Sequence, residues 1–205
     1  MLERKAKEME FIVREKTVDD STVSFEMTDP NGNEVGSATM KRRAAGDAWE
    51  FEMNAFGRRT RAFEDDGLRD ATLVENKKAS KTFPKYVVTT DGKKTGTAFV
   101  REPNYDFGEI QVVEISCVEG SAFRMRPSTL AKRNKTAFVT HDEFYGEETL
   151  GTLERSETET DATKARANVP GDAPLVATLL LLSKAFDRFA KRAPKSRRFF
   201  RRGGK

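Results

Sequence analysis

The sequence is poor in the residues that build metal sites and disulfides. Among 205 residues there is one cysteine, Cys117, and one histidine, His141. A lone cysteine has no partner for a disulfide within the chain, and these two residues cannot supply the four ligands of an ordinary zinc site. We therefore expect neither a disulfide scaffold nor a bound metal.

Long hydrophobic runs and catalytic motifs are also lacking. Hydrophobic residues make up 37% of the chain and the mean hydropathy is −0.68, which excludes a multi-span membrane protein. We find no secretory signal, no nucleophile elbow, no phosphate-binding loop and no dinucleotide fingerprint. These absences predict a soluble, cytoplasmic protein that is not an enzyme and uses no cofactor or small-molecule substrate.

Most of the first 155 residues alternate apolar and polar side chains, with Gly or Asp-Gly between the alternating segments. Val23, Phe25 and Met27 share one face of such a segment. Period-two segments separated by turn residues are typical of antiparallel hairpins. The pattern predicts about twelve strands, at residues 10–17, 22–28, 34–42, 48–56, 60–64, 69–75, 85–90, 94–101, 109–116, 121–126, 136–140 and 149–155.

A weak internal repeat relates two of these hairpins. Gly32 and Gly36 in the first copy correspond to Gly92 and Gly96 in the second, with the same spacing. No helix follows either pair, so a phosphate-binding role is not indicated. We expect the first glycine of each pair to adopt a positive φ in the turn and the second to allow a bend or a close approach.

The pattern changes near residue 170, where a helix is predicted over residues 172–190. Asp172 is a candidate N-cap and Pro174 fits the first turn. The first half of this helix is apolar on every face and too short to cross a bilayer, so it must be buried in protein. Its expected core residues are Leu175, Val176, Leu179, Leu180 and Leu182.

About twelve strands and one apolar helix are best combined in a mainly β fold, a closed antiparallel barrel that encloses the C-terminal helix. Closure removes exposed sheet edges, and a barrel of this size has room for a helix. We therefore expect a barrel domain over residues 1–190 and a basic flexible tail over residues 191–205.

The Asp-Gly hairpins at Asp66-Gly67 and Asp91-Gly92, together with the helix entry Gly171-Asp172-x-Pro174-Leu175-Val176-Ala177-x-Leu179, resemble the tubby-like superfamily. The resemblance is to its LURP-one-related and phospholipid-scramblase-like branch and covers roughly residues 8–190. It implies a twelve-stranded barrel around a hydrophobic C-terminal helix, and a non-enzymatic protein that meets phospholipid at a membrane surface. The cysteine-rich segment of scramblases is missing, so scrambling activity is not implied.

The tail carries the strongest functional signal. Residues 191–205 hold eight basic residues and no acidic one, whereas residues 1–190 hold 29 basic and 33 acidic residues. Basic residues bind anionic leaflets, and adjacent phenylalanines insert at the interface. We expect peripheral attachment to anionic membrane lipid, at the inner membrane face, through Lys191, Arg192, Lys195, Arg197, Arg198, Phe199, Phe200, Arg201 and Arg202.

Two other partners remain open for this tail. Nucleic acid would accept the same cations on its phosphates and the phenylalanines on unpaired bases. The protein could equally be a structural or interaction barrel with another partner, whose tail only solubilises it. The sequence indicates no oligomeric state.

Three further groups have weaker functional signals. His141 lies in an acidic segment with Asp142, Glu143, Glu147 and Glu148, which favours a solvated hairpin loop over an acid–base site. Cys117 is expected to be a small buried hydrophobe. Two basic stretches would extend the tail's positive surface only if they shared one face; they contain Arg58, Arg59, Arg61, Arg124, Arg126, Lys132, Arg133 and Lys135.

Overall fold

The computed structural model describes residues 8–44, 48–65, 84–101, 112–125, 137–143, 146–156, 159 and 161–192. These residues form twelve strands, followed by a short 3₁₀ helix and one α-helix. The strands are β1 (Met9–Asp19), β2 (Thr22–Thr28), β3 (Glu34–Arg42), β4 (Trp49–Ala55), β5 (Arg58–Glu64), β6 (Tyr86–Thr90), β7 (Lys93–Arg101), β8 (Val112–Cys117), β9 (Ala122–Met125), β10 (Ala137–Glu143), β11 (Gly146–Arg155) and β12 (Ala162–Ala167). The 3₁₀ helix is η4 (Pro170–Asp172) and the α-helix is α2 (Ala173–Arg192).

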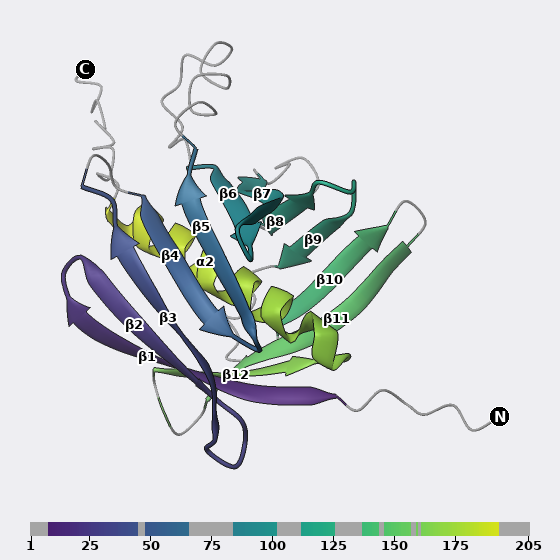
Figure 1. The fold of residues 1–205 in the computed structure, drawn as a ribbon, viewed down its shortest axis with the longest axis horizontal. Helices are drawn as coiled ribbons and strands as arrows, with labels where there is room; N and C mark the ends of the chain where they lie inside the picture. The colour runs from purple at the N-terminus through teal and green to yellow at the C-terminus, as the bar shows by residue number, and fades with distance from the viewer. Residues whose placement is uncertain are drawn as a thin grey trace, which may run out of the picture.

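The strands pair in chain order, and every pairing is antiparallel. β1 pairs with β2 on one side and with β12 on the other, from Met9 opposite Ala167 to Arg14 opposite Ala162. The order of pairings thus returns to its start, which is the strand order of a closed barrel. The sheet curves around α2, which runs through its middle (Figure 1). The prediction of a mainly β, antiparallel fold with one C-terminal helix is confirmed.

The alternation in the sequence places large apolar side chains on the inner face of the sheet. In β2, Val23, Phe25 and Met27 are at most 2% exposed, while Glu26 between them is exposed. In β4, Trp49 and Met53 face inward in the same way. Together with the apolar residues of α2, these side chains form one hydrophobic core between the helix and the sheet.

The glycine repeat has the structural roles expected of it. Gly32 and Gly92 have φ of 87° and 78° in their turns. Gly36 and Gly96 lie so close to the neighbouring strand that an added Cβ would meet an atom of it within 2.6 Å. The register shifts after Met27 in the first hairpin and after Val88 in the second, so each copy contains a bulge just before its turn.

Three strand predictions need correction or cannot be tested, and one strand was missed. β12 was not predicted, because its inward face consists of Ala165 and Ala167 instead of large apolar residues. β10 and β11 extend further into the acidic segment than predicted, to Glu143 and from Gly146, because polar residues continue the pairing there. The strand expected at residues 69–75 lies outside the described residues, and β5 pairs directly with β6.

Candidate functional site

Helix α2 enters the interior of the sheet at one end and leaves it at the other. α2 begins directly after β12 and η4, at the end where β2 turns into β3 and β4 into β5. It leaves at the opposite end, where β1 turns into β2 (Asp19–Thr22) and where β4 and β6 begin, at Trp49 and Tyr86. Contacts of Arg188 with Trp49, and of Phe186 with Tyr86, establish this direction. We call this second end the exit end.

The first half of α2 is buried inside the sheet. Val176, Leu179, Leu180 and Leu182 are at most 1% exposed, and Leu175 is partly buried against the same core. The helix begins at Ala173, one residue after the predicted N-cap, with Pro174 in its first turn, where an amide hydrogen has no partner within the helix.

Two hydroxyl groups in the buried part of α2 bond within the helix itself. The Thr178 hydroxyl donates to the carbonyl of Pro174 at 2.7 Å, and the Ser183 hydroxyl donates to that of Leu180 at 2.7 Å. Neither polar side chain therefore requires a partner from the sheet. This segment is structural, because its polar groups are already satisfied and its other side chains are apolar.

The character of α2 changes at the exit end, where a carboxylate from β1 meets two cations of the helix. Glu15 follows Phe11 and Val13 on the inward side of β1. Its carboxylate accepts hydrogen bonds from Lys184 Nζ, at 2.8 Å, and from the Arg188 guanidinium. The three side chains are 21–24% exposed, so the cluster lies at the boundary between the core and solvent.

Aromatic rings complete the surroundings of the two cations. Arg188 Cζ lies 5.2 Å from the centre of the Trp49 ring, and Lys184 Nζ lies 5.9 Å from that of Phe25. Both distances allow a cation–π attraction. Burial alone would raise the pKa of Glu15, but the charges and hydrogen bonds of Lys184 and Arg188 outweigh it and hold the pKa below its ordinary value.

A second inward carboxylate, Glu64, lies at the end of β5, beside this cluster. It stands opposite Tyr86 in the sheet, and its Oε2 atom is 3.6 Å from Arg43 Nη1. The Tyr86 hydroxyl accepts a hydrogen bond from the Trp49 backbone N–H at 3.3 Å. The exit end therefore carries charged and polar side chains, whereas the interior of the sheet is otherwise apolar.

Helix α2 ends at the exit end, where the predicted tail begins in the sequence. Lys191 and Arg192 are in the last turn of α2, with only their backbone described. The remaining predicted site residues lie outside the described residues: Lys195, Arg197, Arg198, Phe199, Phe200, Arg201 and Arg202. Because α2 ends at Arg192, the tail starts from a fixed point at the exit end of the sheet.

Cations on the outer wall of the sheet are compensated by nearby carboxylates. Arg59 and Arg61 pair with Glu52 at 2.8 and 3.5 Å, and Arg58 lies 3.7 Å from Asp91. On β9, Arg124 lies 2.7 Å from Glu114. Each of these four arginines therefore lies next to a carboxylate. Arg126, Lys132, Arg133 and Lys135 lie outside the described residues.

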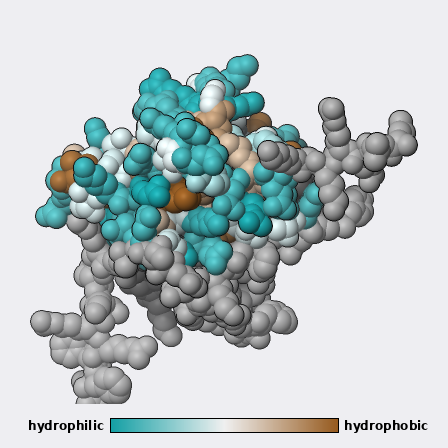
Figure 2. All heavy atoms as spheres, turned by 90° about the horizontal axis from the view of Figure 1, so that it is seen from below, coloured by the Kyte–Doolittle hydropathy of each residue, from teal (hydrophilic) through white to brown (hydrophobic). Residues whose placement is uncertain are grey.

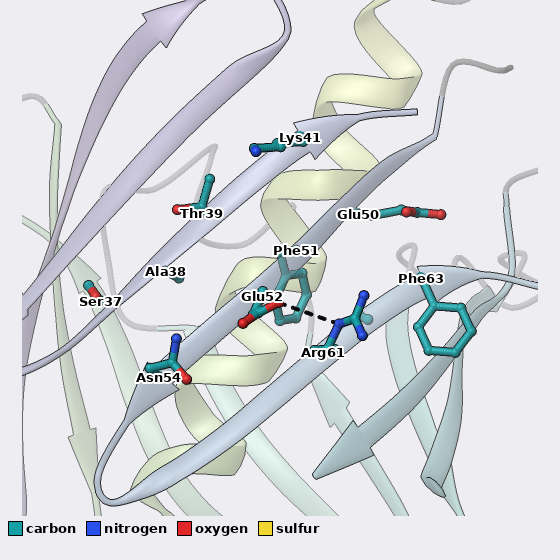
Figure 3. A pocket seen from close by; sticks show the side chains of 11 residues that line it. Ser37, Ala38, Thr39, Lys41, Glu50, Phe51, Glu52, Asn54, Arg61 and Phe63 are labelled. Carbon is teal, nitrogen blue, oxygen red and sulfur yellow. Dashed lines mark ion pairs between the residues drawn. The ribbon is translucent and has the colours of Figure 1, made fainter. Parts of the chain in front are cut away.

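The outer wall also carries a shallow groove of about 370 Å³ across β3, β4 and β5 (Figure 3). Thr39, Lys41, Glu52 and Arg61 line it, and Figure 3 shows Glu52 directed toward Arg61. The face seen in Figure 2 is mostly hydrophilic in its described atoms, with small separate hydrophobic spots. On this face, the described residues form no broad apolar surface (Figure 2).

His141 and Cys117 are the remaining candidates for chemistry, and the described surroundings of neither indicate catalysis. His141 is opposite Phe123 and Glu148 in strand pairings, which corrects its expected position in a loop. Among the described residues, no group of three His, Cys, Asp or Glu side chains could hold a metal. Cys117 is half-buried, not fully buried as expected, and burial together with the charge of Glu119 raises its pKa to about 11. A thiol of this kind is a poor nucleophile at neutral pH.

Sequence reasoning missed Glu15, because its partners lie 169 and 173 residues away along the chain. The signal that could have found it is a charged residue at an inward position of an alternating strand.

Comparison with known proteins leaves the chain without an assigned family. It matches no protein-family model, no curated protein and no solved structure. In the described part of the chain, no helix has the length and hydropathy needed to span a bilayer.

Proposed function

We propose that this protein is a non-enzymatic binding module that attaches peripherally to anionic phospholipid membranes through its basic C-terminal tail. The observation that carries the proposal is the separation of charge along the chain. Residues 191–205 contain eight basic residues and no acidic one. By contrast, cations on the outer wall, such as Arg59, Arg61 and Arg166, have carboxylate partners within 4 Å.

The position of the tail supports the same proposal. The tail follows a helix whose apolar half is buried and whose exit is fixed by Glu15, so its cations are tethered at one end of the sheet. Each basic residue near an anionic leaflet contributes about 1 kcal/mol, and this attraction falls as salt rises. Phe199 and Phe200 supply adjacent apolar side chains for the interface.

Vesicle flotation with and without residues 194–205 tests the proposal. This truncation leaves α2, which ends at Arg192, intact. The full chain is expected to float with vesicles that contain phosphatidylserine, less so at physiological than at low salt, and not with pure phosphatidylcholine. Equal recovery of the full and truncated chains on anionic vesicles would refute the proposal.

The doubly substituted chain F199A/F200A distinguishes lipid from nucleic acid. Loss of the two rings is expected to weaken vesicle binding, whereas duplex DNA held through its phosphates would be affected only mildly. Tight duplex binding without vesicle binding would favour nucleic acid as the partner of the tail.

We also propose that the sheet is a closed barrel of the tubby-like kind. The cyclic order of strand pairings and the buried C-terminal helix support this proposal. If the sheet is closed, the amides shared by β1 and β12 exchange as slowly as those between β3 and β4. Rapid exchange confined to β1 and β12 would show an open edge there instead.

A further inference from the structure

The last turns of α2 carry a stripe of cations that begins inside the exit end. Lys184, Arg188 and Lys191 are separated by four and three residues, so their positions share one face of the helix, with Arg192 beside them. Asp187, at the flank of this stripe, is the acidic residue of the segment. In the sequence, this stripe is followed directly by the basic tail.

Glu15 pairs with the two inner cations of this stripe. It bonds both Lys184 and Arg188, which lie one helical turn apart. Within this trio one carboxylate faces two cations, so Glu15, Lys184 and Arg188 together carry a net positive charge, while the nearby Glu64 pairs with Arg43. All three side chains remain more than a fifth exposed, which leaves the cations within reach of an anion from solvent.

We propose that the exit end is the face of the protein that meets an anionic lipid surface, and that Glu15 is an internal counter-ion that withholds Lys184 and Arg188 from it. This inference rests on the proposed function and adds to it the orientation of the sheet and a carboxylate that limits binding. Lipid phosphates and Glu15 compete for the same two cations, so the strength of attachment depends on which of them the cations engage.

The substitution Glu15→Gln tests this role, and Glu10→Gln is its matched control. Glu10 is also on β1 and also bridges two cations, Lys164 and Arg166, each at 3.0 Å. Both substitutions remove one negative charge from a carboxylate that pairs two cations, although Arg166 also lies 3.5 Å from Glu8. Glu10 is on the outer face and near the other end of β1. Only Glu15→Gln frees cations at the exit end.

Binding is measured by flotation with vesicles of 80% phosphatidylcholine and 20% phosphatidylserine at physiological salt. Glu15→Gln is expected to bind about tenfold more tightly than the wild type, the effect of one to two further cations at an anionic leaflet. Glu10→Gln is expected to stay within about threefold of the wild type. Equal affinities of the two variants would overturn the inference while leaving the tail proposal intact, whereas a wild type that binds no vesicles would overturn both.

A triple variant covers the case in which Glu15→Gln alters the fold. In E15Q/K184Q/R188Q the freed cations are absent, so the gain in affinity is expected to vanish. A gain that persists in this variant would come from an altered structure and would overturn the inference. Thermal unfolding of each variant shows whether the measurement is made on folded protein, and the assay temperature is set below the lowest midpoint.

Discussion

The burial of α2 predicts a large loss of stability for a single truncation in its middle. Leu180 is 1% exposed and belongs to the hydrophobic core. Leu180→Ala removes the equivalent of three methylene groups, worth about 0.8 kcal/mol each in transfer free energy. The cavity that remains adds to this, so we expect the free energy of unfolding to fall by about 3–5 kcal/mol. For a chain of this length, that lowers the melting temperature by roughly 6–20 °C.

Urea and thermal unfolding, followed by circular dichroism, measure this change. The matched control is Val118→Ala, because Val118 is an apolar side chain that is 67% exposed in the β8–β9 turn. Its substitution is expected to change the unfolding free energy by less than about 0.5 kcal/mol. If Leu180→Ala costs no more than Val118→Ala, α2 is not the centre of the core and the reasoning about the fold fails.

Three further predictions concern single residues. Gly151→Ala would place a Cβ 2.1 Å from the carbonyl oxygen of Arg166, so it should destabilise the protein by about 1–3 kcal/mol in urea unfolding, whereas Gly171→Ala, with no atom nearby, should change little. A similar cost for both would contradict the close approach of β11 and β12. Because the folded pKa of Glu15 lies below its ordinary value of 4.5, its ion pairs stabilise the protein above about pH 4.5 and are lost as the pH falls through the folded pKa. The difference in stability between wild type and Glu15→Gln should therefore be constant from pH 5 to 7 and shrink in stronger acid; a difference that grew in acid would refute this. Since the pKa of Cys117 is about 11, iodoacetamide at pH 8 should modify the folded protein about a hundredfold more slowly than the urea-unfolded chain, and equal rates would exclude the raised pKa.

Alternation predicted those strands whose inward face is built from large apolar side chains. Segments such as β2 and β4 were located within one residue of their ends, because Val, Phe and Met at every second position have no other simple explanation. β12 gave no such signal, since it faces the helix with alanines. α2 packs against these alanines. The sequence pattern therefore fails at a strand whose inward side chains are small, and succeeds at β4, which also packs against α2 through large side chains.

The charged cluster at the exit end illustrates a different limit. The helix pattern shows that Lys184 and Arg188 share a face, and the strand pattern shows that Glu15 points inward. Which strand meets which face of the helix depends on the register of the whole sheet around α2, and local periodicity does not contain that information. The tail, in contrast, was identified from composition alone, because its signal is an excess of charge and needs no fold.

The energetics of α2 indicate that the helix stays inside the sheet when the tail binds a membrane. Six of its side chains, Val176, Leu179, Leu180, Leu181, Leu182 and Phe186, are at most 3% exposed. Burial of such side chains contributes about 1.5–3 kcal/mol each, or roughly 9–18 kcal/mol together, whereas eight tail cations at about 1 kcal/mol each provide at most about 8 kcal/mol at a leaflet. Attraction of the tail is therefore too weak to draw the helix out of the core into water. Under the proposed function, the tail and the cations beside Glu15 would therefore form an anchor at one end of the sheet, and a membrane that attracts them would also orient the sheet.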